Sequence, residues 1–213
     1  MRQAREFGAD VIGLSVMTPN AYTLPFVTGL LKEALPQSLI VIGGPHVSAY
    51  GARSLEVNRA DIAVPFEGEL AFEAIVNAFL GAGNMEDVPG IFRRDKDGII
   101  SNPGSPPFVE DIDTLPFPAY DLIDLRPYWR MQTMTASMRR GYVSLFSSRG
   151  CPFKCIYCHR IFGDRLRMHS AARVIEEIRY YKTQYSVSCF EFEDDIFNHD
   201  QKSHQAGRQG GCF

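Results

Sequence analysis

Short apolar runs alternate with helical repeats over the first part of the chain. The runs Val11–Ser15, Leu39–Ile42 and Ile62–Val64 are typical of parallel strands that are buried on both faces. Apolar residues recur at helical spacing after the first and third runs, at Val27, Leu30, Leu31 and Ala34 and at Ala71, Ala74, Ile75, Ala78 and Phe79. This order predicts βαβ units and a mostly parallel, Rossmann-like sheet.

Small and polar residues follow each of the three predicted strands. They are Ser15, Thr18, Gly43, Gly44, Glu67 and Gly68. Because such sheets bind ligands beyond the carboxyl ends of their strands, we expect these six residues to share one binding edge. Each signal is weak alone, since a glycine pair after a strand often makes a tight turn and a hydroxyl often caps a helix.

The pattern changes at about residue 87. Two short apolar runs flank the turn signal Asp95–Gly98, which predicts a β-hairpin. Residues 102–127 are rich in proline, and their apolar side chains indicate that this stretch packs on a surface. We interpret residues 87–140 as a hairpin and an interdomain linker.

Regular alternation resumes after the linker. Tyr142–Phe146 and Phe190–Phe192 are predicted strands, and Ser170 is placed to cap the helix between them. Residues 141–198 therefore predict a second α/β domain. Residues 199–213 have no apolar period, and we expect a disordered or artefactual tail there.

Three cysteines, Cys151, Cys155 and Cys158, form a C-x3-C-x2-C loop directly after the strand at Tyr142–Phe146. Three soft thiolates in one loop favour an iron–sulfur cluster that leaves one iron open. The alternatives are a zinc site completed by His159 and a redox pair within the loop. Cys189, in a later strand, is interpreted as a buried structural cysteine.

Composition narrows the class of protein. The 213 residues carry a formal net charge of −3, which gives no indication of nucleic-acid binding. No apolar run approaches the ~20 residues of a membrane span, and no signal peptide is visible. Five cysteines with three clustered do not suit a secreted disulfide scaffold, so we expect a cytoplasmic protein.

The cysteine loop resembles that of the radical S-adenosylmethionine (radical SAM) superfamily, in which an aromatic residue such as Tyr157 precedes the last cysteine. The resemblance implies a [4Fe-4S] cluster on the three cysteines, with SAM chelating the open iron and being cleaved to a 5′-deoxyadenosyl radical. It implies that Tyr157 flanks the adenine and that an acid of the run Glu193, Asp194 and Asp195 meets the SAM ammonium, with Asp194 and Asp195 as the candidates. It also implies a small-molecule substrate and an external one-electron reductant such as flavodoxin or ferredoxin.

The first 86 residues resemble the cobalamin-binding domain that is fused to many radical SAM enzymes. The resemblance implies that the six residues of the predicted edge contact cobalamin, and it does not make His46 a cobalt ligand. The predicted function is methyl transfer or oxidative cyclisation on an unknown substrate. A cobalamin-free radical SAM member and a zinc-stabilised binding module without catalysis are the alternatives.

The resemblance is incomplete at both ends of the chain. The first strands of the cobalamin-binding domain and the later βα units of a radical SAM partial TIM-like barrel have no counterpart in the sequence. The predicted fold is therefore α/β, with an incomplete Rossmann-like sheet followed by the first βα units of the barrel. We expect the chain to be a fragment and to be inactive alone.

Overall fold

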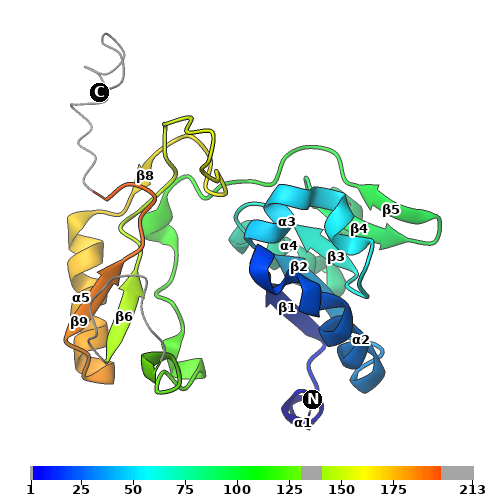
Figure 1. Cartoon of the computed structure of the whole chain (residues 1–213), viewed down its shortest axis with the longest axis horizontal. Coiled ribbons are helices and arrows are strands. Elements are labelled where there is room, and N and C mark those ends of the chain that lie inside the picture. Colours follow the sequence, from blue (N-terminus) through cyan, green and yellow to red (C-terminus); the bar gives the residue numbers. More distant parts are fainter. Residues whose placement is uncertain (1, 131–140, 198–213) are drawn as a thin grey trace. The chain divides into compact units, whose positions relative to one another are not determined.

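The computed structural model describes residues 2–130 and 141–197. They form two compact units, one running to Val109 and including Cys155–Phe162, the other comprising Glu110–Lys154 and the chain from Gly163 (Figure 1). The predicted tail at 199–213 lies outside the described residues. Within the described ranges, none of the helices has the length and apolarity that a membrane crossing requires.

The first unit is built on a five-stranded sheet with the order β1-β2-β3-β4-β5. Its strands are β1 Val11–Ser15, β2 Leu39–Gly43, β3 Ile62–Val64, β4 Phe92–Asp95 and β5 Gly98–Ser101. Its helices are α1 Arg2–Phe7, α2 Leu24–Ala34, α3 Pro45–Tyr50 and α4 Glu69–Phe79, with 3₁₀ turns η1 Thr18–Thr23, η2 Gly51–Leu55 and η3 Met85–Asp87. The predicted strands and helices of this region are confirmed.

Side chains from β2, the middle one of the three parallel strands, enter two separate apolar cores. Ile40 and Ile42 pack with Leu31 of α2 and Val47 of α3. Val41, which points to the opposite face, packs with a second cluster that includes Ala71 and Ile75 of α4. Helices therefore cover both faces of the sheet, and this is why the strands are apolar at every position.

The hairpin β4–β5 extends the sheet of the first unit. β1, β2 and β3 are parallel, whereas β4 runs antiparallel to β3, with Ile62 opposite Arg93. The guanidinium of Arg94 donates to the carbonyls of Leu55, Asn58 and Ala60, which fastens the hairpin beside β3. The hairpin was predicted correctly, but we had placed it with the linker, and these long-range contacts place it with the sheet.

The second unit pairs β6 Tyr142–Leu145 with β9 Cys189–Phe192 in parallel, and helix α5 Ala171–Tyr185 connects them. A two-residue ladder joins β7 Ser148–Arg149 to β8 Arg167–Met168. Three 3₁₀ turns lie in the linker, η4 Ile112–Thr114, η5 Tyr120–Leu122 and η6 Tyr128–Arg130. Tyr181 of α5 is fully buried against Val143 and Leu145, so the predicted strand–helix–strand unit is confirmed.

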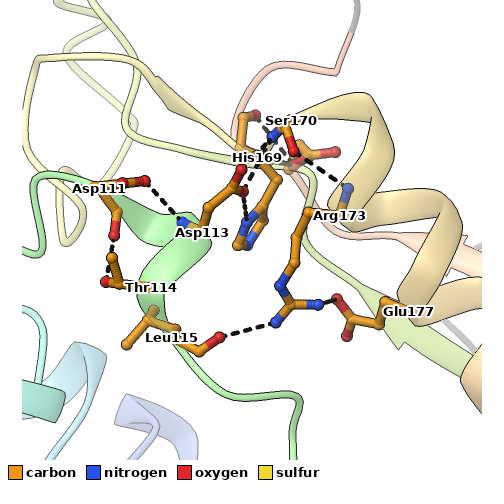
Figure 2. Close-up of polar contacts among 10 residues, drawn as sticks. Asp111, Asp113, Thr114, Leu115, His169, Ser170, Arg173 and Glu177 are labelled. Atoms are coloured by element: carbon orange, nitrogen blue, oxygen red, sulfur yellow. Dashed lines mark hydrogen bonds and ion pairs between the residues drawn. The ribbon is translucent and has the colours of Figure 1, made fainter.

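The proline-rich linker is anchored to the amino-terminal turn of α5 (Figure 2). Ser170 caps α5 by accepting the N–H of Arg173, as predicted. The guanidinium of Arg173 lies 3.8 Å from the ring centre of Phe117, donates to the Leu115 carbonyl at 2.9 Å and pairs with Glu177 at 3.1 Å. The linker residues of the second unit are therefore packed on a surface, as their apolar content indicated.

Candidate functional site

The carboxyl ends of the three parallel strands meet at one edge of the first unit. Ser15 of β1 lies opposite Gly43 of β2, and Gly43 lies opposite Val64 of β3. Ser15 and Thr18 are exposed there, and Gly68 precedes the first turn of α4. The predicted arrangement of the edge is confirmed, whereas the binding role of its residues stays a prediction.

Gly44 makes the closest approach between two strand ends. Its backbone has φ 92° and ψ −173°, a region that only glycine adopts readily. A Cβ atom at this position would lie 2.9 Å from the Val16 nitrogen and 3.0 Å from the Ser15 hydroxyl. Glycine is therefore required, and it keeps the edge between Ser15 and Gly44 free of side-chain bulk.

Glu67 is buried, with 2% of its surface exposed. Its carboxylate accepts the backbone N–H of Val109 at 2.9 Å, so it fastens the end of the first unit to the sheet edge. The preceding residue, Phe66, has φ 62° and donates its N–H to the Ser48 hydroxyl at 2.8 Å. Glu67 therefore has a structural role, and its contact with cobalamin stays a prediction.

His46 lies at the start of α3 on the same edge. Its N–H donates to the Val16 carbonyl at 3.0 Å, and its ring stacks on Tyr50 with a centroid distance of 4.4 Å. The Nδ1 atom is buried and has no hydrogen-bond partner within the described part of the chain. These contacts give His46 a local role in the turn that begins α3.

The cysteine loop follows β7 in the chain. The N–H of Cys151 donates to the Gly163 carbonyl at 3.3 Å, and the N–H of Cys158 donates to the Cys155 carbonyl at 3.2 Å. All three cysteines are free, and Cys155 and Cys158 are exposed. Tyr157 is 89% exposed, and a hydrogen bond with the Cys155 thiol raises the pKa of its phenol.

The donor chemistry of this loop fits an iron–sulfur cluster. It supplies three free thiols within eight residues and no carboxylate among them. Among residues 2–130 and 141–197, no group of three or more His, Cys, Asp and Glu side chains is arranged to hold a metal ion. The assignment therefore depends on the type and spacing of the ligands. Cys189 in β9 is half-buried, less than we expected for a structural cysteine.

The acidic run after β9 lies beside the chain that leads into the cysteine loop. The carboxylate of Asp194 accepts the Ser147 hydroxyl at 2.8 Å, the Ser148 hydroxyl at 3.0 Å and the Ser148 N–H. Asp195 accepts the N–H of Gly150 at 3.1 Å. Burial, and secondarily the charge of Glu191, raises the pKa of Glu193. Asp194 and Asp195 thus have structural partners that the sequence did not reveal.

Comparison with known proteins gives one domain family and several related sequences. The B12 binding domain family matches residues 1–76. The uncharacterized methyltransferase PH0819 of Pyrococcus horikoshii is 31% identical over 201 residues, which cover 93% of this chain and 42% of the relative. The anaerobic magnesium-protoporphyrin IX monomethyl ester cyclase of Rubrivivax gelatinosus is 28% identical over 87% of this chain and 33% of its own length.

The structural comparison gives the same fold. The cobalamin-dependent S-adenosylmethionine radical enzyme OxsB superposes with a TM-score of 0.75 and 18% identity, over 98% of this chain and 28% of that one. Residues 1–76 thus match the B12 binding domain family, and the chain has the fold of this cobalamin-dependent radical SAM enzyme. The chain spans less than half the length of the curated relatives named above.

Two groups of residues at the site were missed by the sequence analysis. Ser147 and Ser148 hold Asp194, although both read as ordinary loop residues. The second group is a contact between Asp113 of the linker and His169, which directly precedes the cap residue Ser170 of α5 (Figure 2). The only local signal for the first group was an acidic run and a serine pair, each at the end of a predicted strand.

Proposed function

We propose that this chain carries the cofactor-binding part of a cobalamin-dependent radical SAM enzyme. The observation that carries the proposal is the C-x3-C-x2-C loop directly after β6–β7, held at its start by two carboxylates from the end of β9. A parallel strand pair joined by a helix, with the ligand loop after the first strand, is the arrangement the superfamily resemblance implies.

Cys151, Cys155 and Cys158 would hold a [4Fe-4S] cluster through three irons. Bound there, the cluster would supply one electron for the reductive cleavage of SAM to a 5′-deoxyadenosyl radical. Tyr157 is exposed beside two of the ligands, where its ring is free to flank the adenine. We propose that an external protein such as flavodoxin or ferredoxin donates this electron, and that the chain functions in the reducing cytoplasm.

The SAM ammonium calls for a carboxylate near the end of β9. Within the run Glu193, Asp194 and Asp195, the sequence favoured the two aspartates as candidates. Because Asp194 and Asp195 already accept hydrogen bonds from the β7 segment, Glu193 is the acid of this run best placed to receive a ligand.

Cobalamin is proposed to bind at the carboxyl edge of β1–β3. The match of residues 1–76 to the B12 binding domain family supports this, as does the position of Gly43 and Gly44 beside the exposed Ser15 at the end of the neighbouring strand. Ser15 and Thr18 would donate or accept hydrogen bonds with the ligand. Glu67 and Gly68 would frame the third strand end, with Glu67 fixed by Val109.

The proposed reaction is methyl transfer or oxidative cyclisation of a small molecule. The relatives are named for both chemistries, a methyltransferase in Pyrococcus horikoshii and a cyclase in Rubrivivax gelatinosus. In a methyl transfer, cobalamin would carry the methyl group to the substrate.

Anaerobic reconstitution with iron and sulfide tests the cluster proposal. The wild-type chain is expected to gain visible absorbance and iron, and Cys151→Ala is expected to lose both, because two thiols cannot hold the cluster. Cys189→Ala is the matched control, since it removes a thiol outside the loop and should load like the wild type. A colourless chain that holds stoichiometric zinc on the loop would contradict the proposal.

Titration with hydroxocobalamin tests the second cofactor separately. The chain is expected to shift the visible spectrum of the added cobalamin. Gly44→Ala is expected to weaken binding because its Cβ would clash with Val16 and Ser15 and displace the strand end that carries Ser15. Gly29→Ala, in α2 with no neighbour within 4 Å, is the matched control. Absence of binding by a folded wild-type chain would remove cobalamin from the proposal while leaving the cluster result unaffected.

A further inference from the structure

Asp194 is the residue through which the end of β9 contacts the start of the cysteine loop. One of its carboxylate oxygens accepts both the N–H and the hydroxyl of Ser148, and the other accepts the hydroxyl of Ser147 at 2.8 Å. Ser148 is buried, so its N–H depends on this carboxylate for a partner. Three hydrogen bonds to one carboxylate fix the direction in which the chain leaves β6.

Asp195 continues the same contact toward the ligands. Its carboxylate accepts the N–H of Gly150, which directly precedes Cys151. Gly150 is buried and has φ 86°, a conformation that turns the chain sharply at this point. The N–H of Cys151 then donates to the Gly163 carbonyl, which closes the base of the loop.

The pairing of β6 with β9 brings these groups together. Leu145 lies opposite Phe192, and the N–H of Glu193 donates to the Leu145 carbonyl at 2.9 Å. The pairing therefore continues one step beyond the strands, and the two residues after Glu193 contact the chain that follows β6. The acidic side chains after β9 therefore have a structural purpose, because they accept hydrogen bonds from backbone N–H groups after β6.

We propose that Asp194 and Asp195 are positioning residues that set the backbone from which Cys151 reaches its metal. This inference rests on the proposed cluster function and assigns these two acids a role other than contact with SAM. Charge-assisted hydrogen bonds to a carboxylate are strong, and the three that Asp194 accepts already occupy most of its acceptor sites. A loop that is already ordered favours metal binding because less conformational entropy is lost when the metal binds.

The decisive experiment compares four chains by two measurements. Backbone amide exchange of Ser148 and Gly150 is followed in the metal-free protein, and iron per chain is measured after anaerobic reconstitution. In Asp194→Ala, the exchange of the Ser148 amide is expected to rise about tenfold or more and the iron content to fall. Asp194→Asn keeps an oxygen acceptor and is expected to retain most of both properties. Asp164→Ala, an exposed aspartate near the loop, is the control and should match the wild type.

Two results would overturn the proposal. Wild-type exchange and iron content in Asp194→Ala would show that the contacts do not position the loop. Equal losses of SAM affinity in Asp194→Ala and Asp194→Asn, with iron content unchanged in both, would make Asp194 a direct ligand of the ammonium. If Asp194→Ala does not fold, Ser147→Ala removes one partner of the same carboxylate, and faster Ser148 exchange with reduced iron is expected there. Wild-type behaviour of a folded Ser147→Ala chain would then overturn the proposal.

The same measurements separate this proposal from the proposed function. A wild-type chain that takes up no iron would contradict the cluster assignment. The amide exchange of Ser148 and Gly150 is measured without metal, so it would still decide whether the two carboxylates hold the β7 segment.

Discussion

The carboxylate of Asp113 in the linker lies 2.8 Å from Nδ1 of His169, the second residue before α5 (Figure 2). The same carboxylate accepts the N–H of Ser170 at 3.0 Å, and the N–H of His169 donates to the Ser147 carbonyl at 2.9 Å. The side chain of His169 is only 8% exposed. Asp113 therefore links the linker to the cap of α5 and, through His169, to the residue that contacts Asp194.

Removing the charge of Asp113 is expected to loosen the second unit. Asp113→Asn should lower its unfolding free energy by about 1 kcal/mol, because charge-assisted hydrogen bonds to His169 and Ser170 become neutral or are lost. Urea unfolding followed by the fluorescence of Trp129 measures this, since Trp129 is the only tryptophan and packs in the core of the second unit. Asp121→Asn, an exposed aspartate of the same linker, should change little. Equal stabilities of the two variants would contradict the prediction.

The contribution of Asp113 depends on pH in a defined direction. The hydrogen bond from Ser170, aided by the contacts of His169, lowers the pKa of Asp113. A lowered pKa in the folded state means that the stabilisation is complete above the unfolded value, about pH 4, and is lost as the pH falls through the folded value. The difference in unfolding free energy between the wild type and Asp113→Asn should therefore shrink below about pH 4. If the difference in unfolding free energy between the two proteins instead grew as the pH fell below about 4, the pKa of Asp113 would not be lowered by folding and the prediction would be wrong.

Gly44 is expected to tolerate no side chain. Gly44→Ala combines a backbone region almost confined to glycine with a Cβ contact of 2.9 Å to the Val16 nitrogen. We expect a loss of about 1–3 kcal/mol from the backbone alone, measured as faster amide exchange in β2. Gly29→Ala adds a methyl to α2 without any neighbour within 4 Å, and it should stabilise the unit by about 0.5–1 kcal/mol. A neutral Gly44→Ala would mean that the strand ends can separate.

Glu67 is expected to fasten the end of the first unit. Glu67→Ala leaves the buried N–H of Val109 without this acceptor, which costs about 1–3 kcal/mol. The Val109 amide should then exchange much faster with solvent. Glu73→Ala, on the exposed face of α4, serves as the control and should leave Val109 protected. Unchanged protection of Val109 in Glu67→Ala would show that other contacts hold this segment.

The sheet of the first unit could be predicted because its strands are short, apolar and buried on both faces. Ile40, Val41 and Ile42 carry that signal without any knowledge of distant residues. The carboxyl-edge position of Ser15 and Gly43 followed from the parallel order alone. Local patterns were sufficient wherever a strand or helix buries a periodic set of side chains.

Contacts between distant polar residues could not be predicted. Nothing near Glu67 indicates that its carboxylate accepts the N–H of Val109, 42 residues away. The partners of Asp194 lie 46 and 47 residues earlier, in a serine pair with no distinctive pattern. The resemblance therefore suggested ligand contacts for these acids, whereas the fold uses them first to satisfy buried backbone groups.

The most direct test of the central claim is the electron paramagnetic resonance spectrum of the reduced, reconstituted chain before and after SAM is added. A cluster held by Cys151, Cys155 and Cys158 leaves one iron open, so SAM should change the g-values of the signal. Cys189→Ala should behave like the wild type, and Cys151→Ala should give no such signal. A wild-type spectrum that SAM leaves unchanged, or a chain loaded only with zinc, would contradict the account.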